Sequence, residues 1–451
     1  MTNFAIQPQS GWGRFPLGEG PLFRPERRSD VANILASGLF PSYIPRGLGR
    51  SYGDTALNGQ GGVIDQTRLN RMLAFDPATG ALTCEAGVSF AEIIETFLPR
   101  GWFLPVTPGT KFVTVGGAIA NDVHGKNHHI DGAFSRFVEE LTLLTPTGEV
   151  LTCSPTEHAD VFWATVGGVG LTGTILTARF RLTRVSTAYA HVTYRQAKNL
   201  DEALALFAED GDRHRLSVAW IDCLARGASM GRSVLMLGDY ATPEQLGAGT
   251  APLALAPAKK LAIPMDFPSG TLNRYSVAAF NALFYAKHGN RDQVVHFEPY
   301  FYPLDAIRDW NRMYGKAGFV QYQVALPEST AREGLTELLE RFSGSGRASF
   351  LAVLKRFGPE GSGLLSFPMA GYTLALDLPM DATLPAFLRE LDARVVAWGG
   401  RLYLAKDALV SREHFERMYP RLAEFKAIQR RLDPQGRMGS TQARRLGLVE
   451  G

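Results

Sequence analysis

Three glycine-rich stretches decide how the first half of this chain folds: RGLGRSYGD at 46–54, VTVGGAIANDVHGKNHH at 113–129 and GGVGLTG at 167–173. Between Gly47 and Gly173 lie 19 of the 47 glycines in the 451-residue chain. Such density inside a folded domain is typical of tight turns, or of backbone that approaches a ligand closely. Loop content alone is the alternative to a ligand site.

The stretches imitate two nucleotide-binding motifs without matching either. GVGLTG at 168–173 has the spacing GxGxxG, but a dinucleotide fingerprint follows a strand and opens a helix. Here a predicted helix over 155–166 comes first and a predicted strand over 173–185 follows. The GK pair at 125–126 lacks the flanking glycine and hydroxyl residue of a P-loop. Three separate glycine loops, whose N–H groups can converge on phosphate oxygens, instead suit an extended ligand with a central diphosphate.

Composition excludes several classes of protein. The chain has 47 Lys and Arg against 44 Asp and Glu, so nothing indicates a nucleic-acid partner. A hydrophobic content of 45% excludes intrinsic disorder. The three cysteines are far apart and predict neither a disulfide framework nor a cysteine metal site. We find no signal peptide and no apolar run long enough to span a membrane, so a cytoplasmic protein is expected.

The pattern along the chain predicts a change of architecture near residue 185. Before it, short strands alternate with turns, a helix over 27–38 capped by Ser29 or Asp30, a helix over 89–98 capped by Ser89, and a hairpin over 138–152. After it, longer helices and strands indicate an α+β domain, interrupted by a Pro- and Ala-rich loop at 249–270. A basic helix is predicted near 412–431. The expected division is 1–184, 185–400 and 401–451.

These stretches resemble the FAD-binding domain of the vanillyl-alcohol-oxidase (PCMH-type) flavoprotein superfamily, in which the first loop and the V-x-x-G-G segment cradle the FAD diphosphate. The resemblance implies an α+β protein. Its PCMH-type FAD-binding domain would consist of two small α/β subdomains. The region 185–400 would form an α+β substrate cap with an antiparallel sheet, and 401–451 would return to the FAD-binding domain.

Longer motifs narrow the resemblance to the oxidase subunits of decaprenylphosphoryl-β-D-ribose 2-epimerase. That resemblance implies FAD-dependent oxidation of the ribose 2-hydroxyl of a polyprenyl-phosphoryl ribose to the 2-keto sugar, the first half of epimerisation to the arabinose donor. It further implies a separate NAD(P)H-dependent short-chain reductase as partner, and a lipid substrate that allows peripheral contact with the inner membrane. A soluble aldonolactone or polyol oxidase is the alternative. The motifs are GWGR (11–14), WNRMYGKAGFVQYQ (310–323), LSFPMAGY (365–372) and RLYLAKD (401–407).

The resemblance assigns FAD-binding positions mainly to the glycine loops. Many superfamily members carry, before the serine of the first loop, a histidine that is bonded to the flavin. Arg50 stands there in this chain and cannot form that bond, so non-covalent FAD is expected. The expected cofactor-binding residues are Arg46, Gly47, Leu48, Gly49, Arg50, Ser51, Tyr52, Pro108, Gly109, Thr110, Val113, Thr114, Gly116, Gly117, Ala118, Asn121, Asp122, His124, Gly125, Asn127, Gly170, Gly173, Thr174 and Ile175.

Lys406, His124 and Tyr52 are the expected catalytic residues. Lys406 lies where the related lactone oxidases place a lysine beside the flavin, and burial would lower its pKa for work as a base. A surface lysine paired with Asp407 is the alternative. Tyr52 either flanks the flavin ring or packs in the core. His124 and His128 have the spacing of metal ligands, but the glycine between them argues against a helix, and no metal is expected.

Further positions are assigned to the substrate. Gln321 and Gln323 alternate around Tyr322 and would share one face of a strand. Thr373 and Ala375 replace the Asn and Cys of the best-known family members, and Ala375 has no thiol for nitroaromatic inhibitors to capture. A plain surface position is the alternative for Gln321 and Lys355. The expected substrate-binding residues are Lys126, Tyr314, Gln321, Gln323, Lys355, Thr373, Ala375 and Tyr403.

Overall fold

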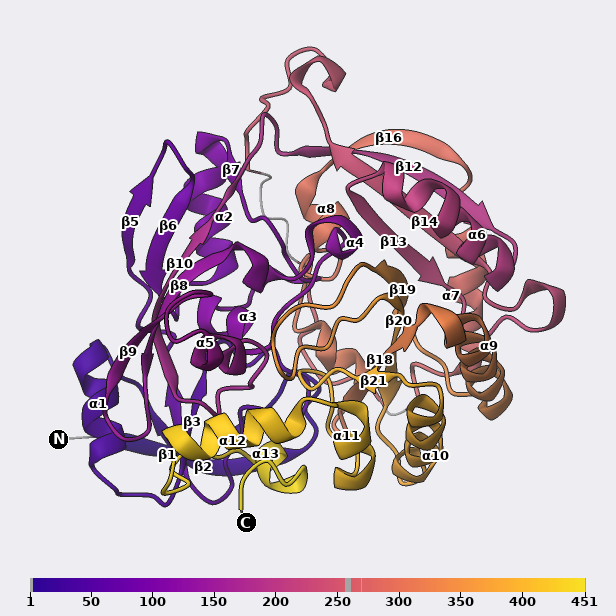
Figure 1. The fold of residues 1–451 in the computed structure, drawn as a ribbon. Coiled ribbons are helices and arrows are strands. Elements are labelled where there is room, and N and C mark those ends of the chain that lie inside the picture. The colour runs from indigo at the N-terminus through magenta and orange to yellow at the C-terminus, as the bar shows by residue number, and fades with distance from the viewer. Residues whose placement is uncertain (1–2, 256–260, 269, 451) are drawn as a thin grey trace.

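Three sheets organise the protein, whose computed structural model describes residues 3–255, 261–268 and 270–450. The indigo-to-purple N-terminal part contains two smaller sheets, and an eight-stranded sheet, coloured from magenta-pink to orange, lies on the other side (Figure 1). The yellow C-terminal helices run beneath both parts. This α+β arrangement is the predicted fold class.

The first sheet has the order β1-β2-β4-β3. Strands β1 and β2 form an antiparallel hairpin, and β4 pairs in parallel with both β2 and β3. The prediction that Ser29 or Asp30 caps the first helix is wrong. Arg27 is the N-cap, and the backbone N–H of Arg27 donates a hydrogen bond to the side chain of Asp30. The elements are β1 (Phe4–Ser10), β2 (Leu17–Phe23), α1 (Arg28–Ala36), β3 (Tyr43–Arg46) and β4 (Gly62–Asp65).

The second sheet is antiparallel, with the order β5-β6-β10-β8-β9. The predicted hairpin is confirmed as β8 and β9, and Ser89 caps α2 as expected. Helix α5 precedes the third glycine loop and β10 follows it, which is the order that excluded a dinucleotide fingerprint. The elements are β5 (Met72–Asp76), β6 (Ala81–Glu85), α2 (Phe90–Phe97), β7 (Trp102–Phe103), α3 (Val115–Ala120), α4 (His128–Asp131), β8 (Val138–Leu144), β9 (Val150–Cys153), α5 (Ala159–Thr165), β10 (Thr174–Arg181) and β11 (Thr183–Arg184).

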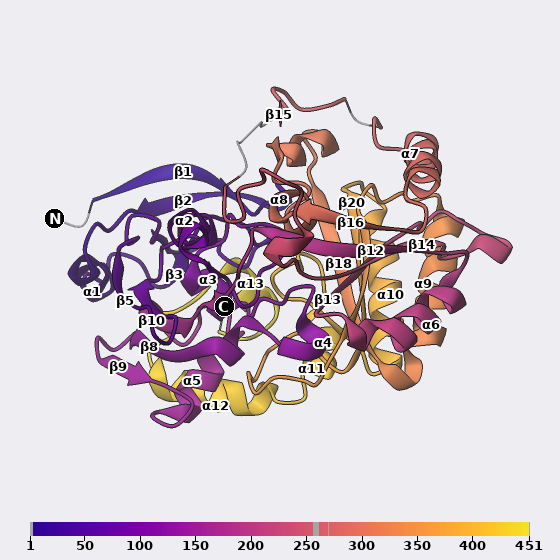
Figure 2. The ribbon, with the colours of Figure 1, turned by 90° about the horizontal axis from the view of Figure 1, so that it is seen from above.

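The large sheet has the order β16-β12-β14-β13-β19-β20-β18-β21 and is antiparallel throughout. Helices α6, α9 and α10 cover one face, while α7 lies over the other (Figure 2). The elements are β12 (Tyr189–Ala197), α6 (Leu200–Asp210), β13 (Leu216–Ile221), β14 (Ser233–Tyr240), α7 (Arg274–Lys287), β16 (Arg291–His296), α8 (Phe297–Phe301), β18 (Phe319–Pro327), α9 (Glu328–Ser345), β19 (Ala352–Phe357), β20 (Gly371–Pro379), α10 (Leu384–Ala397) and β21 (Arg401–Leu402).

The C-terminal segment links the two parts. Strand β21 pairs with β18, and Met438 then forms a bridge with Tyr43 of the first sheet. The single basic helix predicted near 412–431 is wrong, because the chain breaks at Tyr419 and Pro420 into two helices. Helix α12 reaches α5 through an ion pair between Arg431 and Asp160. The elements are α11 (Arg412–Met418), α12 (Leu422–Leu432) and α13 (Thr441–Arg445).

The predicted loop at 249–270 is described only in part. Strand β15 (Leu261–Ala262) pairs in parallel with β17 (Ile307–Arg308). Lys259 and Lys260, which the sequence placed in this loop, lie outside the described residues. Among the parts of the chain that are described, no helix is long and apolar enough to cross a membrane.

Candidate active site

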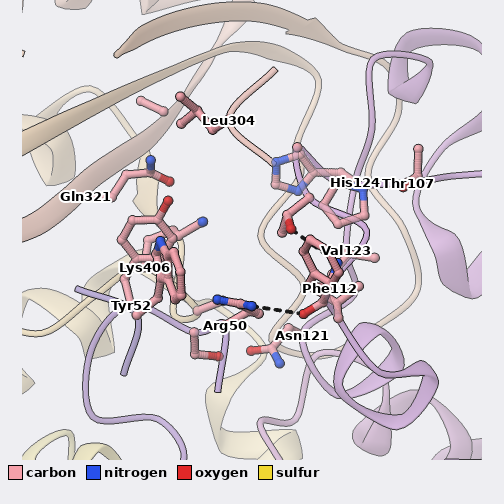
Figure 3. Close-up of a pocket in the computed structure, with 18 of the residues that line it drawn as sticks. Arg50, Tyr52, Thr107, Phe112, Asn121, Val123, His124, Leu304, Gln321 and Lys406 are labelled. Atoms are coloured by element: carbon pink, nitrogen blue, oxygen red, sulfur yellow. Dashed lines mark hydrogen bonds between the residues drawn. The ribbon is translucent and has the colours of Figure 1, made fainter. Parts of the chain in front are cut away.

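One cavity of about 900 Å³ runs between the glycine loops and the large sheet. The backbone of the three glycine-rich stretches lines one side of the cavity. The face of the large sheet that α6, α9 and α10 leave free lines the other side, so Gln321 and Gln323 both line the cavity, as their alternation predicted. Figure 3 shows Lys406 and Tyr52 on one side of this space and His124 on the other.

The glycine backbone leaves the room that FAD needs. A Cβ at Gly109 would meet nothing within 4 Å, and one at Gly117 would meet only the Thr114 hydroxyl, so both glycines present bare backbone to the cavity. Asn121 Oδ1 and His124 Nδ1 are buried without a hydrogen-bond partner in the described protein. Unpaired buried polar atoms are costly, so this donor and acceptor set fits a polar ligand such as FAD.

Most of the expected cofactor positions line the cavity, and four do not. The backbone of Asp122, at φ +39°, turns its carboxylate away, where it accepts a hydrogen bond from Ser366. Asn127 donates to Pro105 O and to Asp131. Ala118 packs in the hydrophobic core, and Thr174 pairs with Leu144 in the second sheet.

Arg50 occupies the position at which related proteins attach flavin. Its guanidinium lies 4.0 Å from the Trp12 ring centroid, and Nε donates to Phe112 O at 3.2 Å (Figure 3). Burial lowers its pKa, and Asp305 opposes that shift. Arginine remains charged under these conditions. The first loop therefore presents a fixed cation, rather than a nucleophile, to the cavity.

Lys406 lies in the turn after β21, with Nζ 3.6 Å from the ring centroid of Tyr52. Burial lowers its pKa below the ordinary value. The alternative of a surface lysine paired with Asp407 is wrong, because Asp407 binds Arg445 at 2.8 Å. The turn contacts the first loop directly, since Tyr52 N donates to Ala405 O at 2.8 Å.

Gly53 makes that contact possible. A Cβ there would lie 2.0 Å from Asp407 O, closer than atoms can approach. Arg445 holds the same junction from below by pairing with Asp54 as well as Asp407, each at 2.8 Å. The SYGD end of the first loop thus positions Lys406.

His124 is buried and neutral. Burial holds its pKa well below the ordinary range, and the charges of Lys355, His128 and Lys406 add to the effect. Gln323 Nε2 lies 3.1 Å from His124 Nε2, so this nitrogen accepts and Nδ1 carries the proton. His124 therefore offers a hydrogen-bond donor. His128 points elsewhere, with Nδ1 accepting from Gly358 N at 3.2 Å.

Two further lysines line the cavity without an ion pair among the described residues. Burial lowers the pKa of Lys126 to about 8, and burial with the charges of Lys126 and Lys406 lowers that of Lys355 to about 7. The Lys126 ammonium lies 5.4 Å from the Tyr300 ring centroid. Buried cations without a counter-ion are costly, so this pair favours an anionic ligand.

The remaining expected substrate residues are split. Thr373, Ala375 and Tyr403 line the cavity, and Tyr403 OH donates to Asn121 O at 2.8 Å. Tyr314 does not line it; its ring stacks on Phe319 at 4.1 Å, in a hydrophobic cluster that also contains Tyr52.

Sequence reasoning missed a set of aromatic and aliphatic residues that extend the cavity beneath α7. The rings of Trp220 and Phe284 lie 4.6 Å apart, and those of Phe280 and Phe350 lie 4.8 Å apart. They come from β12, β13, β14, α7 and the segment just before β19, so only the tertiary arrangement of the sheet and α7 brings them together. The set is Tyr194, Val218, Trp220, Met236, Phe280, Phe284 and Phe350.

Comparisons with known proteins agree with this site. A family model for an FAD binding domain matches residues 22–154, and one for D-arabinono-1,4-lactone oxidase matches 373–446. The chain is 42% identical to decaprenylphosphoryl-β-D-ribose oxidase of Mycolicibacterium smegmatis over 412 residues, 90% of this chain and 89% of the relative. This chain belongs to that family of FAD-dependent oxidoreductases. It is thus an enzyme that uses FAD.

Two other family relatives mark how far the likeness extends. An uncharacterised protein of Streptomyces coelicolor is 36% identical over 370 residues, 80% of this chain and its whole length. L-gulonolactone oxidase of Bos taurus is 26% identical over 442 residues, 92% of each chain.

Proposed function

We propose that this enzyme oxidises the ribose 2-hydroxyl of a polyprenyl-phosphoryl-β-D-ribose to the 2-keto sugar, with FAD bound non-covalently. The observation that carries the proposal is one continuous cavity that joins a glycine cradle, the half-buried Lys406, two half-buried lysines without an ion pair among the described residues, and an aromatic channel. Each part matches one part of such a substrate complex: cofactor, hydroxyl, phosphate and lipid chain.

FAD supplies the two-electron acceptor for alcohol oxidation when it is bound. Lys406 then takes the proton of the substrate hydroxyl, because burial keeps a substantial fraction of its amine neutral near physiological pH. The Tyr52 ring holds the amine in place from beneath. His124, neutral and fixed by Gln323, positions the sugar through a hydrogen bond rather than by proton transfer.

Lys126 and Lys355 bind the phosphodiester in this proposal. An anion would compensate both half-buried ammonium groups and raise their lowered pKa values. A lactone or polyol carries no charge, so it would leave both cations unpaired. The lysine pair therefore favours the phosphoryl sugar over the alternative, although the lactone oxidase match to residues 373–446 supports testing both.

The channel beneath α7 accepts the first isoprene units. It is lined by carbon-rich side chains, and burying each methylene of a lipid there would contribute ~0.8 kcal/mol. Four apolar residues on β15, on the segment that follows it and on α7 are more than 65% exposed: Leu261, Met265, Tyr275 and Leu283. We propose that this surface touches a membrane that holds the rest of the lipid, at the inner membrane of the cell.

The large sheet and its helices act as the substrate cap in this proposal, and residues 401–451 complete the FAD-binding part. The 2-keto product requires a second enzyme to finish an epimerisation. We propose an NAD(P)H-dependent short-chain reductase as that partner, because the described chain carries no dinucleotide fingerprint of its own.

Anaerobic loss of flavin absorbance tests the substrate. Purified enzyme should be bleached rapidly by polyprenyl-phosphoryl ribose, and neither by aldonolactones nor by free polyols. Bleaching by a lactone alone would replace this proposal with the alternative. Lys406→Met should abolish bleaching while FAD stays bound. Lys111→Met is the matched control and should still be bleached, because Lys111 is buried but pairs with Glu298 outside the cavity lining.

A further inference from the structure

Asp377 is a fully buried carboxylate that the proposed chemistry leaves unexplained. It lies on β20 directly opposite Gln321 of β18, whose Nε2 donates to Oδ1 at 2.5 Å. Its backbone N–H donates to Ser349 Oγ at 2.8 Å. Oδ2 has no partner at ordinary hydrogen-bond geometry among the described residues, and the Tyr314 hydroxyl approaches the same carboxyl. A buried carboxylate with a spare oxygen is costly unless a cation acts on it.

Gln321 connects Asp377 to the catalytic group. The side chain that holds Asp377 also contacts the hydroxyl of Tyr52, whose ring carries the Lys406 amine at 3.6 Å. Figure 3 shows Gln321, Tyr52 and Lys406 together on one side of the cavity. Asp377 itself does not line the cavity, so it meets the substrate only through these neighbours.

We propose that Asp377 is a positioning residue that stabilises the ammonium form of Lys406 and thereby sets the pH range in which the enzyme oxidises its substrate. The inference rests on the proposed function, in which Lys406 receives the hydroxyl proton. In that step the substrate O–H bond would break and its proton would join the Lys406 lone pair, while the O–H electrons form the C=O bond of the 2-keto sugar. The carbon-bound hydrogen would leave as a hydride, together with both electrons of the C–H bond, to bound FAD. The charge of the Asp377 carboxylate then stabilises the new positive charge on Lys406.

The charged and titratable groups of the described chain around this pair include Arg50 and Asp305, whose charges act on Tyr52. Burial raises the pKa of Asp377 and lowers that of Lys406, and each charge opposes the shift of the other. Tyr52 and Tyr314 stay protonated because burial raises their pKa values far above the ordinary range. Cys223 acts on Tyr314, and burial raises its pKa to about 12. The charge of Lys406 contributes to the lowered pKa values of Lys355 and His124, and His124 is neutral. Asp377 is the anion that acts on Lys406.

Asp377→Asn tests the proposal, because it removes the charge and keeps the shape. Without the carboxylate, the Lys406 ammonium is less stable, so its pKa falls. We expect the acid limb of the bleaching rate to move about one pH unit lower, and the plateau rate to fall about tenfold, because proton transfer to a weaker base is slower. The KM for the substrate should stay unchanged. Unchanged pH limbs, or a shift to higher pH, would overturn the inference.

Asp392→Asn is the matched control. Asp392 is also a buried carboxylate on the large sheet's helix layer, accepts from Tyr322 OH at 3.0 Å, and lies on the opposite side of β18 from Asp377. Burial raises its pKa to about 7 as well. Asp392→Asn should leave both the acid limb and the plateau of the bleaching rate unchanged. If it moved them as Asp377→Asn does, the effect would be general strain and the inference would fail.

A second readout separates this inference from the proposed substrate. Trace acetic anhydride labels neutral amines, and peptide mass spectrometry of the FAD-loaded enzyme gives the pH at which half of Lys406 reacts. Asp377→Asn should lower that pH while Lys126, whose pKa shift comes from burial alone, serves as internal reference. The labelling pH is measured without any substrate. If polyprenyl-phosphoryl ribose failed to bleach the enzyme, the proposed function would be refuted, and the labelling pH of Lys406 would still test whether Asp377 stabilises its ammonium form. If Asp377→Asn loses FAD, Asp377→Glu must keep the wild-type profile.

Discussion

Gly53→Ala adds one methyl group at the junction between the first glycine loop and the Lys406 turn. Its Cβ would lie 2.0 Å from Asp407 O and 2.9 Å from the Ala408 Cβ, so the two segments must separate by about an ångström. Overpacking of this kind costs about 1–3 kcal/mol of folding free energy. The larger effect should be on catalysis, since a displacement of about 1 Å in a reacting group can cost about 100-fold in rate.

The measurement is the rate of anaerobic flavin bleaching together with the FAD content of the purified variant. We expect FAD to be retained, because the cradle glycines are untouched, and the rate to fall by about two orders of magnitude. Gly59→Ala is the matched control: it lies beyond the same loop, and a Cβ there meets nothing within 4 Å. Wild-type bleaching by Gly53→Ala would show that the close contact does not position Lys406 and would refute the reasoning.

Four further results are expected. Lys355→Met should stabilise the protein by about 1–3 kcal/mol near pH 6, where the Lys355 ammonium is charged. The gain should shrink as pH rises through about 7 towards the pKa of lysine in the unfolded chain. A gain in thermal unfolding that is equal at all pH values would contradict this. Trp220→Ala should raise KM for a long-chain substrate and leave a short-chain analogue unaffected in steady-state kinetics. Acid precipitation should release all flavin into the supernatant, because Arg50 cannot bond it; a yellow pellet would show covalent attachment. Intact mass after turnover with a nitroaromatic inhibitor should be unchanged for the wild type and increased for Ala375→Cys, which places a thiol in the cavity.

Local patterns in the sequence predicted much of the fold. Ser89 capped its helix as expected because Glu92 completes a capping box three residues on. The cap of the first helix could not be found this way, because Asp30 acts from the third helical position and Arg27 is an unusual N-cap. Pro420 accounts for the break in the basic helix predicted near 412–431, because proline has no backbone N–H to continue the helix there.

In the candidate site too, local sequence patterns predicted some residues, and the residues that depend on tertiary structure were missed. Glycine spacing located the cradle, and strand alternation placed Gln321 and Gln323 on the cavity face. The misses depend on tertiary structure: the positive φ of Asp122 turns its side chain to Ser366, and Tyr314 packs against Phe319 in a hydrophobic cluster. Trp220 and Phe284, far apart in sequence, meet only because α7 lies across the large sheet.

The junction of Arg445 with Asp54 and Asp407 has a consequence for how each molecule matures. The first loop is synthesised early, whereas Lys406 and Arg445, which ties that loop to the Lys406 turn, are synthesised only after all strands of the large sheet. A growing chain can form its first two sheets, yet it cannot close the cavity until its C-terminal helices are free to fold back. We expect stable uptake of FAD to follow completion of the chain, so that a truncated protein is left without a working redox centre.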